Sequence, residues 1–370
     1  MLKFLDKYQI NEAKIAVGVS GGADSLALVL RMNEELSAIG KKVIALTVDH
    51  QLREESKAEA EYVASVMNDF NVEHHILVWE GDKPRTGIEE AAREARYALL
   101  QDWCRDNGVN VLAIAHHAKD QAETFFLRLQ RGSGLFGLSG MQAVSQRGDL
   151  KVIRPLLHTD PKQLKDYLQS KNVEWVEDPS NQCEDFFRVK IRKHLDTWLN
   201  ELSMPLSRLP ETMDELSRAR NYIQVQVNKF IKNNVCYWGD CGLSLSFNVL
   251  KEQHDEIVFQ VLAELLRQVG KQVYIARAEG IERLAKSLFN NFNCINDIGG
   301  VKNFSGATLG GCEVFLQYGK IWIVPELKIK NKMPKQVWSD FCELYPVFKK
   351  QKLPYKLRVV LVKTKMKVEF

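Results

Sequence analysis

The first 170 residues alternate short apolar runs with longer segments in which apolar positions recur at helical spacing. Runs such as "VIALTV" and "VLAIA" carry no polar alternation, which is typical of strands buried on both faces of a parallel sheet. The order strand, helix, strand, helix predicts a doubly wound α/β domain. The predicted strands are 14–20, 42–49, 74–79, 109–116 and 151–157, and the predicted helices are 24–38, 54–70, 87–107, 119–130 and 160–171.

The pattern changes after this region. Residues 172–195 break the alternation, and helical periodicity then dominates to about residue 290, as in "DEIVFQVLAELLRQVG". Past residue 300, "CEVFLQYGKIWIVPE" and "LRVVLVK" look like strands, and the short tail leaves open whether the last module is complete. We therefore expect an α/β domain at 1–195, a mainly helical domain at 196–295 and a small basic α+β domain at 296–370.

The junction of the first strand and first helix carries "SGGADS" at 20–25. The first N–H groups of a helix lack partners at the positive end of its dipole, and adjacent glycines let that backbone approach a ligand closely. The loop therefore predicts a phosphate cradle. A tight turn in which Asp24 or Ser25 caps the helix explains the same residues equally well. The loop matches neither G-x-x-x-x-G-K-[ST] nor G-x-G-x-x-G.

Polar residues also follow two other predicted strands. Asp49 and His50 follow the second strand, and His116 and His117 follow the fourth. Because ligands bind beyond the carboxyl ends of parallel strands, these residues are expected to lie near the glycine loop. Adjacent histidines without a cysteine partner do not favour a zinc site; one of them is expected to cap the next helix or to contact adenine or phosphate.

Composition narrows the class of protein. No apolar run reaches eighteen residues, and the seven cysteines form no C-x-x-C pair, so we expect no membrane span and reduced thiols, as in a cytoplasmic protein. The net charge is +4, but residues 321–370 carry twelve Lys and Arg against four Asp and Glu. A basic end suggests a nucleic-acid partner, and a solvated lysine-rich tail explains it as well. The sequence leaves homodimer formation open.

Taken together, these motifs resemble a known family. S-G-G-x-D-S is the phosphate loop of the N-type ATP pyrophosphatases, or PP-loop proteins, and "SGGADS" matches its fixed positions. The later motifs are similar to those of the bacterial tRNA(Ile)-lysidine synthases over most of the first 195 residues, and thin out beyond. They are "VDHQLR" at 48–53, "AREARY" at 92–97, "AHHAKDQAET" at 115–124, "RGSGLFGLSGM" at 131–141, "RPLL" at 154–157, "EDPSN" at 177–181 and "TLGGC" at 308–312.

The resemblance implies a fold and a reaction. The fold is a doubly wound parallel sheet, followed by a mainly helical domain and a small α+β domain. In the reaction, ATP adenylates the oxygen on carbon 2 of the wobble cytidine of tRNA(Ile) with the anticodon CAU, and pyrophosphate leaves. The ε-amine of free L-lysine then attacks that carbon and expels AMP. The product, lysidine, reads AUA instead of AUG.

The resemblance also implies roles for individual residues. ATP is expected to contact Ser20, Gly21, Gly22, Ala23, Asp24, Ser25 and His116. The expected catalytic residues are Asp24, Asp120 and Arg188, of which the two aspartates would hold Mg²⁺. The expected contacts to tRNA or substrate are Arg93, Arg96, Tyr97 and Arg131, with the helical region and the basic end as further tRNA readers. Asp120 as a first-turn helix stabiliser, and the α-helical arginines as a solvated stripe, remain alternatives.

Two positions depart from the family pattern. Lys119 stands where the family often has Asp, and Val189 follows Arg188 where an Asn is usual.

Three other functions compete with this interpretation, namely two related enzyme classes and one tRNA-binding protein. A tRNA thiolase would usually show paired cysteines, and a glutamine-dependent synthetase would need an amidotransferase portion. An inactive tRNA-binding protein is the third.

Overall fold

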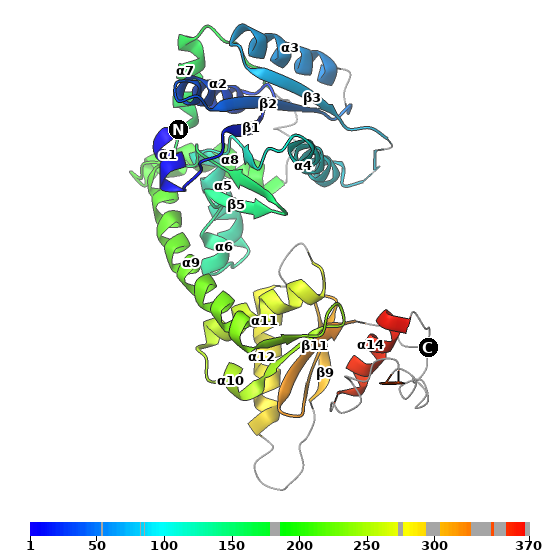
Figure 1. The fold of residues 1–370 in the computed structure, drawn as a ribbon. Helices are drawn as coiled ribbons and strands as arrows, with labels where there is room; N and C mark the ends of the chain where they lie inside the picture. Colours follow the sequence, from blue (N-terminus) through cyan, green and yellow to red (C-terminus); the bar gives the residue numbers. More distant parts are fainter. Residues whose placement is uncertain are drawn as a thin grey trace. The chain divides into compact units, whose positions relative to one another are not determined.

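The computed structural model describes residues 1–52, 55–81, 83–84, 86–177, 186–272, 277–293, 304–326, 342–343 and 353–366. Contacts along the chain group it into two compact units, Met1–Arg220 and Asn221–Phe370 (Figure 1). Helix α9 (Arg208–Asn234) contributes its first half to one unit and its second half to the other.

The first unit is built on a six-stranded sheet in the order β3-β2-β1-β4-β6-β5. All neighbouring strands are parallel except the β5–β6 pair. The predicted doubly wound parallel sheet is therefore confirmed. The strands are β1 (Lys14–Gly18), β2 (Lys42–Asp49), β3 (Glu73–Val78), β4 (Val111–Ala113), β5 (Val144–Arg147) and β6 (Leu150–Ile153).

Helices cover both faces of this sheet. Alternate residues of β1 enter different cores: Ile15 and Val17 pack with residues of α2, α3 and α7, whereas Ala16 packs with residues of α4. The helices are α1 (Leu2–Lys7), α2 (Ala23–Ser37), α3 (Glu55–Asp69), α4 (Ile88–Asp106), α5 (Ala118–Gln130), α6 (Leu135–Leu138), α7 (Pro161–Ser170) and α8 (Phe186–Glu201).

The second unit contains an antiparallel sheet in the order β7-β8-β11-β10-β9. One core joins this sheet to α9, α10, α11 and α12, and a separate core joins it to α14. The elements are β7 (Val235–Tyr237), β8 (Leu243–Ser246), α10 (Phe247–Lys251), α11 (Asp255–Val269), α12 (Ala278–Asn293), β9 (Phe304–Leu309), β10 (Cys312–Gln317), β11 (Lys320–Pro325) and α14 (Tyr355–Met366).

Some elements differ from the sequence-based expectation. The antiparallel strand β5 was not expected, and "LRVVLVK", which looks like a strand, lies in helix α14. Strands β7 and β8 lie inside the segment expected to be mainly helical; β7 pairs with β8, and β8 pairs with β11 from beyond residue 300. The functional boundaries at residues 195 and 295 remain predictions. In the part of the chain that the structure describes, no helix is long and apolar enough to cross a bilayer.

Helix α2 directly follows the glycine loop and depends on the core beneath it. Leu28 has no exposed surface in this core. We expect Leu28→Ala to lower the free energy of unfolding by about 2–5 kcal/mol, because it removes buried methyl groups and leaves a cavity. Urea denaturation of both proteins measures the difference.

Leu202→Ala makes the same chemical change at a side chain that is 68% exposed. We expect it to change the free energy of unfolding by no more than about 0.5 kcal/mol. Equal losses for the two variants would contradict the described position of α2 in the core.

Candidate active site

The glycine loop joins β1 to α2 and is held by its own serines. The Ser20 amide donates to Ser25 Oγ at 3.1 Å, and Ser25 Oγ donates to the Gly22 carbonyl at 3.0 Å. Gly21 has a φ of +82°, which favours glycine, and its carbonyl accepts from the Val176 amide at 3.0 Å. Gly22 is the N-cap of α2, and because glycine has no side chain, no side-chain hydrogen bond caps this helix. The loop thus has the shape and the amide donors that a phosphate site requires.

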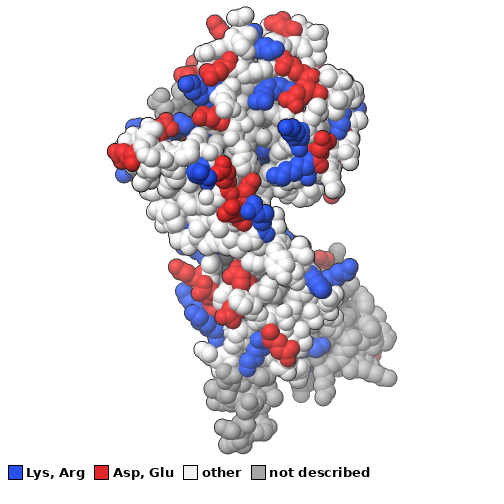
Figure 2. Space-filling view, turned by 90° about the vertical axis from the view of Figure 1, so that its left-hand side faces the viewer, with Lys and Arg blue, Asp and Glu red and all other residues white. Residues whose placement is uncertain are grey.

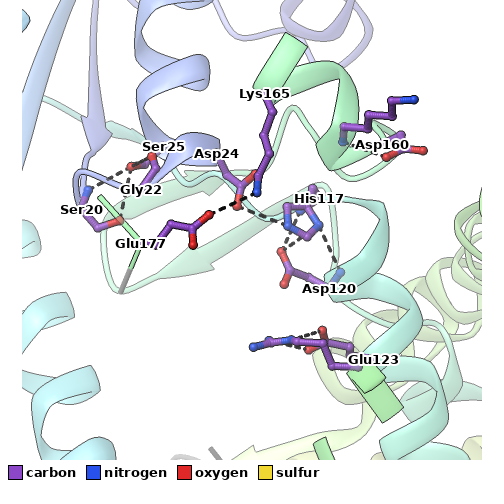
Figure 3. A network of polar contacts seen from close by, with 12 residues as sticks. Ser20, Gly22, Asp24, Ser25, His117, Asp120, Glu123, Asp160, Lys165 and Glu177 are labelled. Carbon is purple, nitrogen blue, oxygen red and sulfur yellow. Dashed lines mark hydrogen bonds and ion pairs between the residues drawn. The ribbon is translucent and has the colours of Figure 1, made fainter. Parts of the chain in front are cut away.

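His117 connects the two helices that begin at this edge of the sheet (Figure 3). Its Nε2 lies 3.4 Å from Asp24 Oδ2 on α2, and its Nδ1 lies 3.4 Å from Asp120 Oδ2 on α5. His117 also caps α5: the Asp120 amide donates to Nδ1 at 3.3 Å, and the Asp120 carboxylate accepts from the His117 amide at 2.9 Å. The predicted catalytic aspartates therefore lie on either side of one imidazole ring.

In this cluster, burial and the neighbouring charges shift the pKa values in opposite directions. Burial alone would lower the pKa of His117, but Asp24 and Asp120 outweigh it and the pKa is raised. Burial raises the pKa of the Asp120 carboxyl, and His117 opposes that rise. Within the described residues no group of three or more His, Cys, Asp or Glu could hold a metal ion. Two carboxylates nevertheless fit Mg²⁺, which commonly takes one or two protein carboxylates together with substrate phosphates.

A buried carboxylate lies one helical turn beyond Asp120. Glu123 is 2% exposed, and its Oε1 accepts from Arg192 Nε at 2.8 Å. Its Oε2 accepts from Arg192 Nη2 at 3.1 Å and lies 3.2 Å from Arg188 Nε. Both arginines belong to α8, so these charge-assisted contacts join α8 to α5. Arg188, predicted from the sequence as a catalytic cation, is thus held in position by its ion pair with Glu123.

His116 faces a different group of residues. Its Nδ1 accepts from Arg154 Nε at 3.2 Å, which leaves the proton of the neutral ring on Nε2. Burial, together with the charges of Arg154, Arg93 and Arg96, lowers the pKa of His116 to about 3. Arg154 is held in turn by the Gln142 carbonyl at 3.0 Å and Ser145 Oγ at 2.9 Å. His116 is therefore a neutral hydrogen-bonding group.

The expected tRNA contacts on α4 form a cationic cluster around one ring. Tyr97 is 6% exposed, and the guanidinium carbons of Arg93 and Arg147 lie 5.7 and 4.5 Å from its centroid. Burial lowers the pKa of Arg96, whose charge also reaches His50 at the end of β2. Arg131 lies apart from this group, at the C-cap of α5. Tyr97 is thus buried, whereas the side chains of Arg93 and Arg96 keep exposed surface; their contact with tRNA or substrate stays a prediction.

The two departures from the family pattern have different outcomes. Lys119 pairs with Asp196 of α8 at 2.8 Å, so it supports the same α5–α8 contact as Glu123. Val189 follows Arg188 inside α8.

Two of the family motifs are only partly described. In "EDPSN", Glu177 lies 3.7 Å from Lys165, whereas residues 178–181 lie outside the described part of the chain, as does Arg53 of "VDHQLR". Cys104 is buried, which raises its pKa to about 12, so it is a poor thiolate nucleophile.

Comparisons with known proteins show the family to which this chain belongs. A family model described as a PP-loop domain matches residues 1–199. A tRNA(Ile)-lysidine synthase from Hyphomonas neptunium is 32% identical over 321 residues, which cover 85% of this chain and 82% of that protein. The chain belongs to this synthase family. It is therefore a PP-loop enzyme with an ATP-binding domain.

Two further synthases of this name give similar matches. The protein from Orientia tsutsugamushi is 30% identical over 293 residues, covering 78% of this chain and 66% of that protein. The protein from a Wolbachia of Brugia malayi is 31% identical over 323 residues, covering 85% and 71%. The chain thus spans about two thirds to four fifths of the length of these synthases.

Sequence reasoning missed four features of the site: the position of His117 between the two aspartates, the buried Glu123, and the partner arginines Arg154 and Arg192. One signal was available for Glu123. It lies three residues after Asp120, and residues at this spacing share one face of a helix. Nothing in the sequence pattern indicates that its partners lie more than sixty residues away on α8.

The two loop glycines should respond differently to an added methyl group. At Gly21 an alanine would adopt a strained φ, and its Cβ would lie 3.3 Å from Val63 Cγ2. We expect Gly21→Ala to lower the free energy of unfolding by about 1–2 kcal/mol. Gly22 has an extended φ, and its nearest neighbour, Ser20 Oγ, lies at 3.7 Å.

Gly22→Ala is therefore the matched control. We expect its free energy of unfolding to stay within about 0.5 kcal/mol of the wild type. Denaturant titration of both variants gives the two values. A larger loss for Gly22→Ala than for Gly21→Ala would contradict the described loop.

The protonation of His116 gives a second test. The pKa of His116 is about 3 in the folded protein and about 6.5 in the unfolded chain. As the pH falls below about 6.5 the unfolded chain takes up a proton that the folded protein does not. The stability that neutral His116 contributes is therefore fully present above that pH and is lost as the pH falls through the folded pKa. We expect NMR to show a neutral ring protonated on Nε2 at pH 5. Arg154→Leu should raise the pKa of His116, because it removes a nearby cation. Half-protonation of the wild-type ring near pH 6.5 would refute this description.

Proposed function

We propose that this chain uses ATP to attach free L-lysine to carbon 2 of the wobble cytidine of tRNA(Ile) with the anticodon CAU. The reaction passes through an adenylated cytidine and gives lysidine, which changes the codon read from AUG to AUA. One observation carries the proposal: His117 draws Asp24 and Asp120 together directly beside the glycine loop of a PP-loop domain. Relatives that are 30–32% identical to this chain carry the name tRNA(Ile)-lysidine synthase.

In the first step the loop holds ATP for attack at its α-phosphate. Amides at the start of α2 and the hydroxyl of Ser20 donate to the β- and γ-phosphate oxygens, which carry charge away with pyrophosphate. Transfer of this kind depends on positioning and charge neutralisation more than on a protein nucleophile. His116, neutral and protonated on Nε2, supplies a further donor without adding charge.

Asp24 and Asp120 are the residues that would hold Mg²⁺, which neutralises phosphate charge when bound. His117 restrains both carboxylates because each lies against one of its ring nitrogens. This restraint keeps the two acceptors aligned at the loop before ATP arrives. Such pre-organisation lowers the cost of ordering the site on binding.

In the second step the ε-amine of lysine attacks carbon 2 and AMP leaves. The lysine ammonium must first lose a proton. Solvent takes up that proton, because Asp120 is assigned to Mg²⁺ and Glu123 is paired with two arginines. Arg188, held by Glu123, faces the phosphate that departs with AMP.

The tRNA is proposed to contact the arginines of α4 and the second unit. On the face of the first unit in Figure 2, Lys and Arg alternate with Asp and Glu, so contact there depends on local clusters more than on one broad basic field. Most of the basic segment 321–370 lies outside the described residues. We place the reaction in the cytoplasm. It requires no homodimer, because the proposed catalytic residues all lie in one unit of one chain.

Incorporation of radiolabelled lysine into a tRNA(Ile) transcript with the anticodon CAU tests the proposal. We expect incorporation that requires ATP and Mg²⁺ and is absent with an elongator methionine tRNA of the same anticodon. Asp24→Asn should lower the rate by about 10²–10³-fold, because it removes a carboxylate that would hold the Mg²⁺ needed to neutralise phosphate charge. Asp69→Asn, an exposed change on α3, should leave the rate unchanged.

Two outcomes would contradict the proposal. Tight binding of the transcript with no incorporation would instead fit an inactive tRNA-binding protein. Incorporation of sulfur in place of lysine would fit a thiolase.

A further inference from the structure

Two arginines of the first unit hold the same short loop. Arg128, near the end of α5, donates through Nη1 to the carbonyls of Gly137 and Gly140, the latter at 3.1 Å. Arg220, on α9, lies with its Nη1 3.5 Å from Ser139 Oγ and its guanidinium carbon 5.6 Å from the Phe136 centroid. Residues 128 and 220 are far apart in sequence, and residues 136–140 bring their guanidinium groups together.

The hydrogen bonds of these arginines leave donors unused. A guanidinium has five N–H donors arranged as a planar fork. Among the described residues, the hydrogen bonds of Arg128 and Arg220 use only Nη1 and end on neutral oxygens. The Nε and Nη2 edges of both side chains remain available, and these edges are suited to bidentate contact with a planar or tetrahedral anion.

The charges reinforce this arrangement. Burial lowers the pKa of Arg128, and the nearby charges of Arg220 and Arg131 lower it further. Burial also lowers the pKa of Arg220. Among the described residues no acidic side chain pairs with Arg128 or Arg220, and partly buried like charges destabilise a fold. An anion bound between the two arginines would relieve that repulsion. Such a cluster is typical of a binding site rather than of a structural brace.

We propose that Arg128 and Arg220 bind a backbone phosphate of the tRNA substrate, an inference that rests on the proposed function. Arg128 lies eight residues along α5 from Asp120, about 12 Å at the helical rise per residue. A phosphate of ATP held at the glycine loop therefore does not occupy this site. A tRNA whose wobble base enters the active site carries further backbone phosphates about 12 Å from that base. The charge of Arg131, at the end of α5, also lies near Arg128.

The tightly packed loop positions the pair. Gly140 has a φ of +66°, and a Cβ there would lie 1.8 Å from Met213 Cε on α9. The loop is therefore pressed directly against the helix that carries Arg220. Ser217 of α9 adds a hydrogen bond to Gln142 Oε1 at 2.7 Å. The separation of α5 and α9 at this loop is thus fixed by packing, as a bidentate anion site requires.

The salt dependence of tRNA affinity tests this site. We expect Arg220→Gln to weaken binding of the tRNA(Ile) transcript about tenfold near 0.1 M salt and to lower the slope of log K against log salt by about 0.7–0.9. Because the contact is to the backbone, binding of the elongator methionine tRNA should weaken by the same factor. ATP affinity should not change, since the loop at Ser20 is separate.

Arg218→Gln is the matched control. It lies on the same helix, is 71% exposed and pairs with Glu215, so its affinity and slope should equal those of the wild type. Arg220→Lys keeps the charge but loses the fork. It should keep the wild-type slope while binding weakens about threefold, and it provides the decisive measurement if Arg220→Gln does not fold.

The outcomes separate this site from the proposed function. Unchanged tRNA affinity and slope in Arg220→Gln, beside a wild type that incorporates lysine, would overturn the phosphate site alone. Parallel losses of ATP affinity and thermal stability would show a structural brace and would also overturn it. A wild type that binds no tRNA would overturn both proposals.

Discussion

The site depends on a single imidazole held between two carboxylates. Strands β1 and β4 are neighbours in the parallel sheet, so the helices that follow them begin side by side. Each helix places an aspartate in its first turn, where the helix dipole favours negative charge. Two such carboxylates repel each other when brought close. The His117 ring lies 3.4 Å from an oxygen of each carboxylate and accepts a hydrogen bond from the Asp120 amide at Nδ1, so the ring that separates the two carboxylates also caps the start of α5.

Glu123 sets a second constraint on the same helix. A carboxylate that is 2% exposed is costly to bury unless its oxygens are fully bonded, and Arg188 and Arg192 provide those bonds. Helix α8 therefore cannot move away from α5 without leaving a charge unpaired in the protein interior. Lys119 and Asp196 add an exposed pair to this contact, which contributes little by itself. A residue that departs from the family pattern thus serves the same contact.

The parallel sheet was predictable because its strands are uninterrupted apolar runs, and the glycine loop because its residues are unusual at a strand–helix junction. Strand β5 was not, since it is only four residues long and half-buried at the sheet edge. "LRVVLVK" is rich in β-branched residues, yet Leu357, Val360 and Leu361 recur at helical spacing and are buried in α14. The roles of His117 and Glu123 depend on partners distant in sequence, which local patterns do not reveal.

Helix α9 runs across the boundary between the two units, which limits where the chain can be divided. Leu209 and Met213 are buried in the first unit, whereas Val227 and Phe230 belong to the core of the second, all within one uninterrupted helix. Helix formation is cooperative, since each hydrogen bond depends on turns already formed. A cut between the two units would therefore break a helix rather than a linker, and each half would lose the neighbouring turns on which its hydrogen bonds depend.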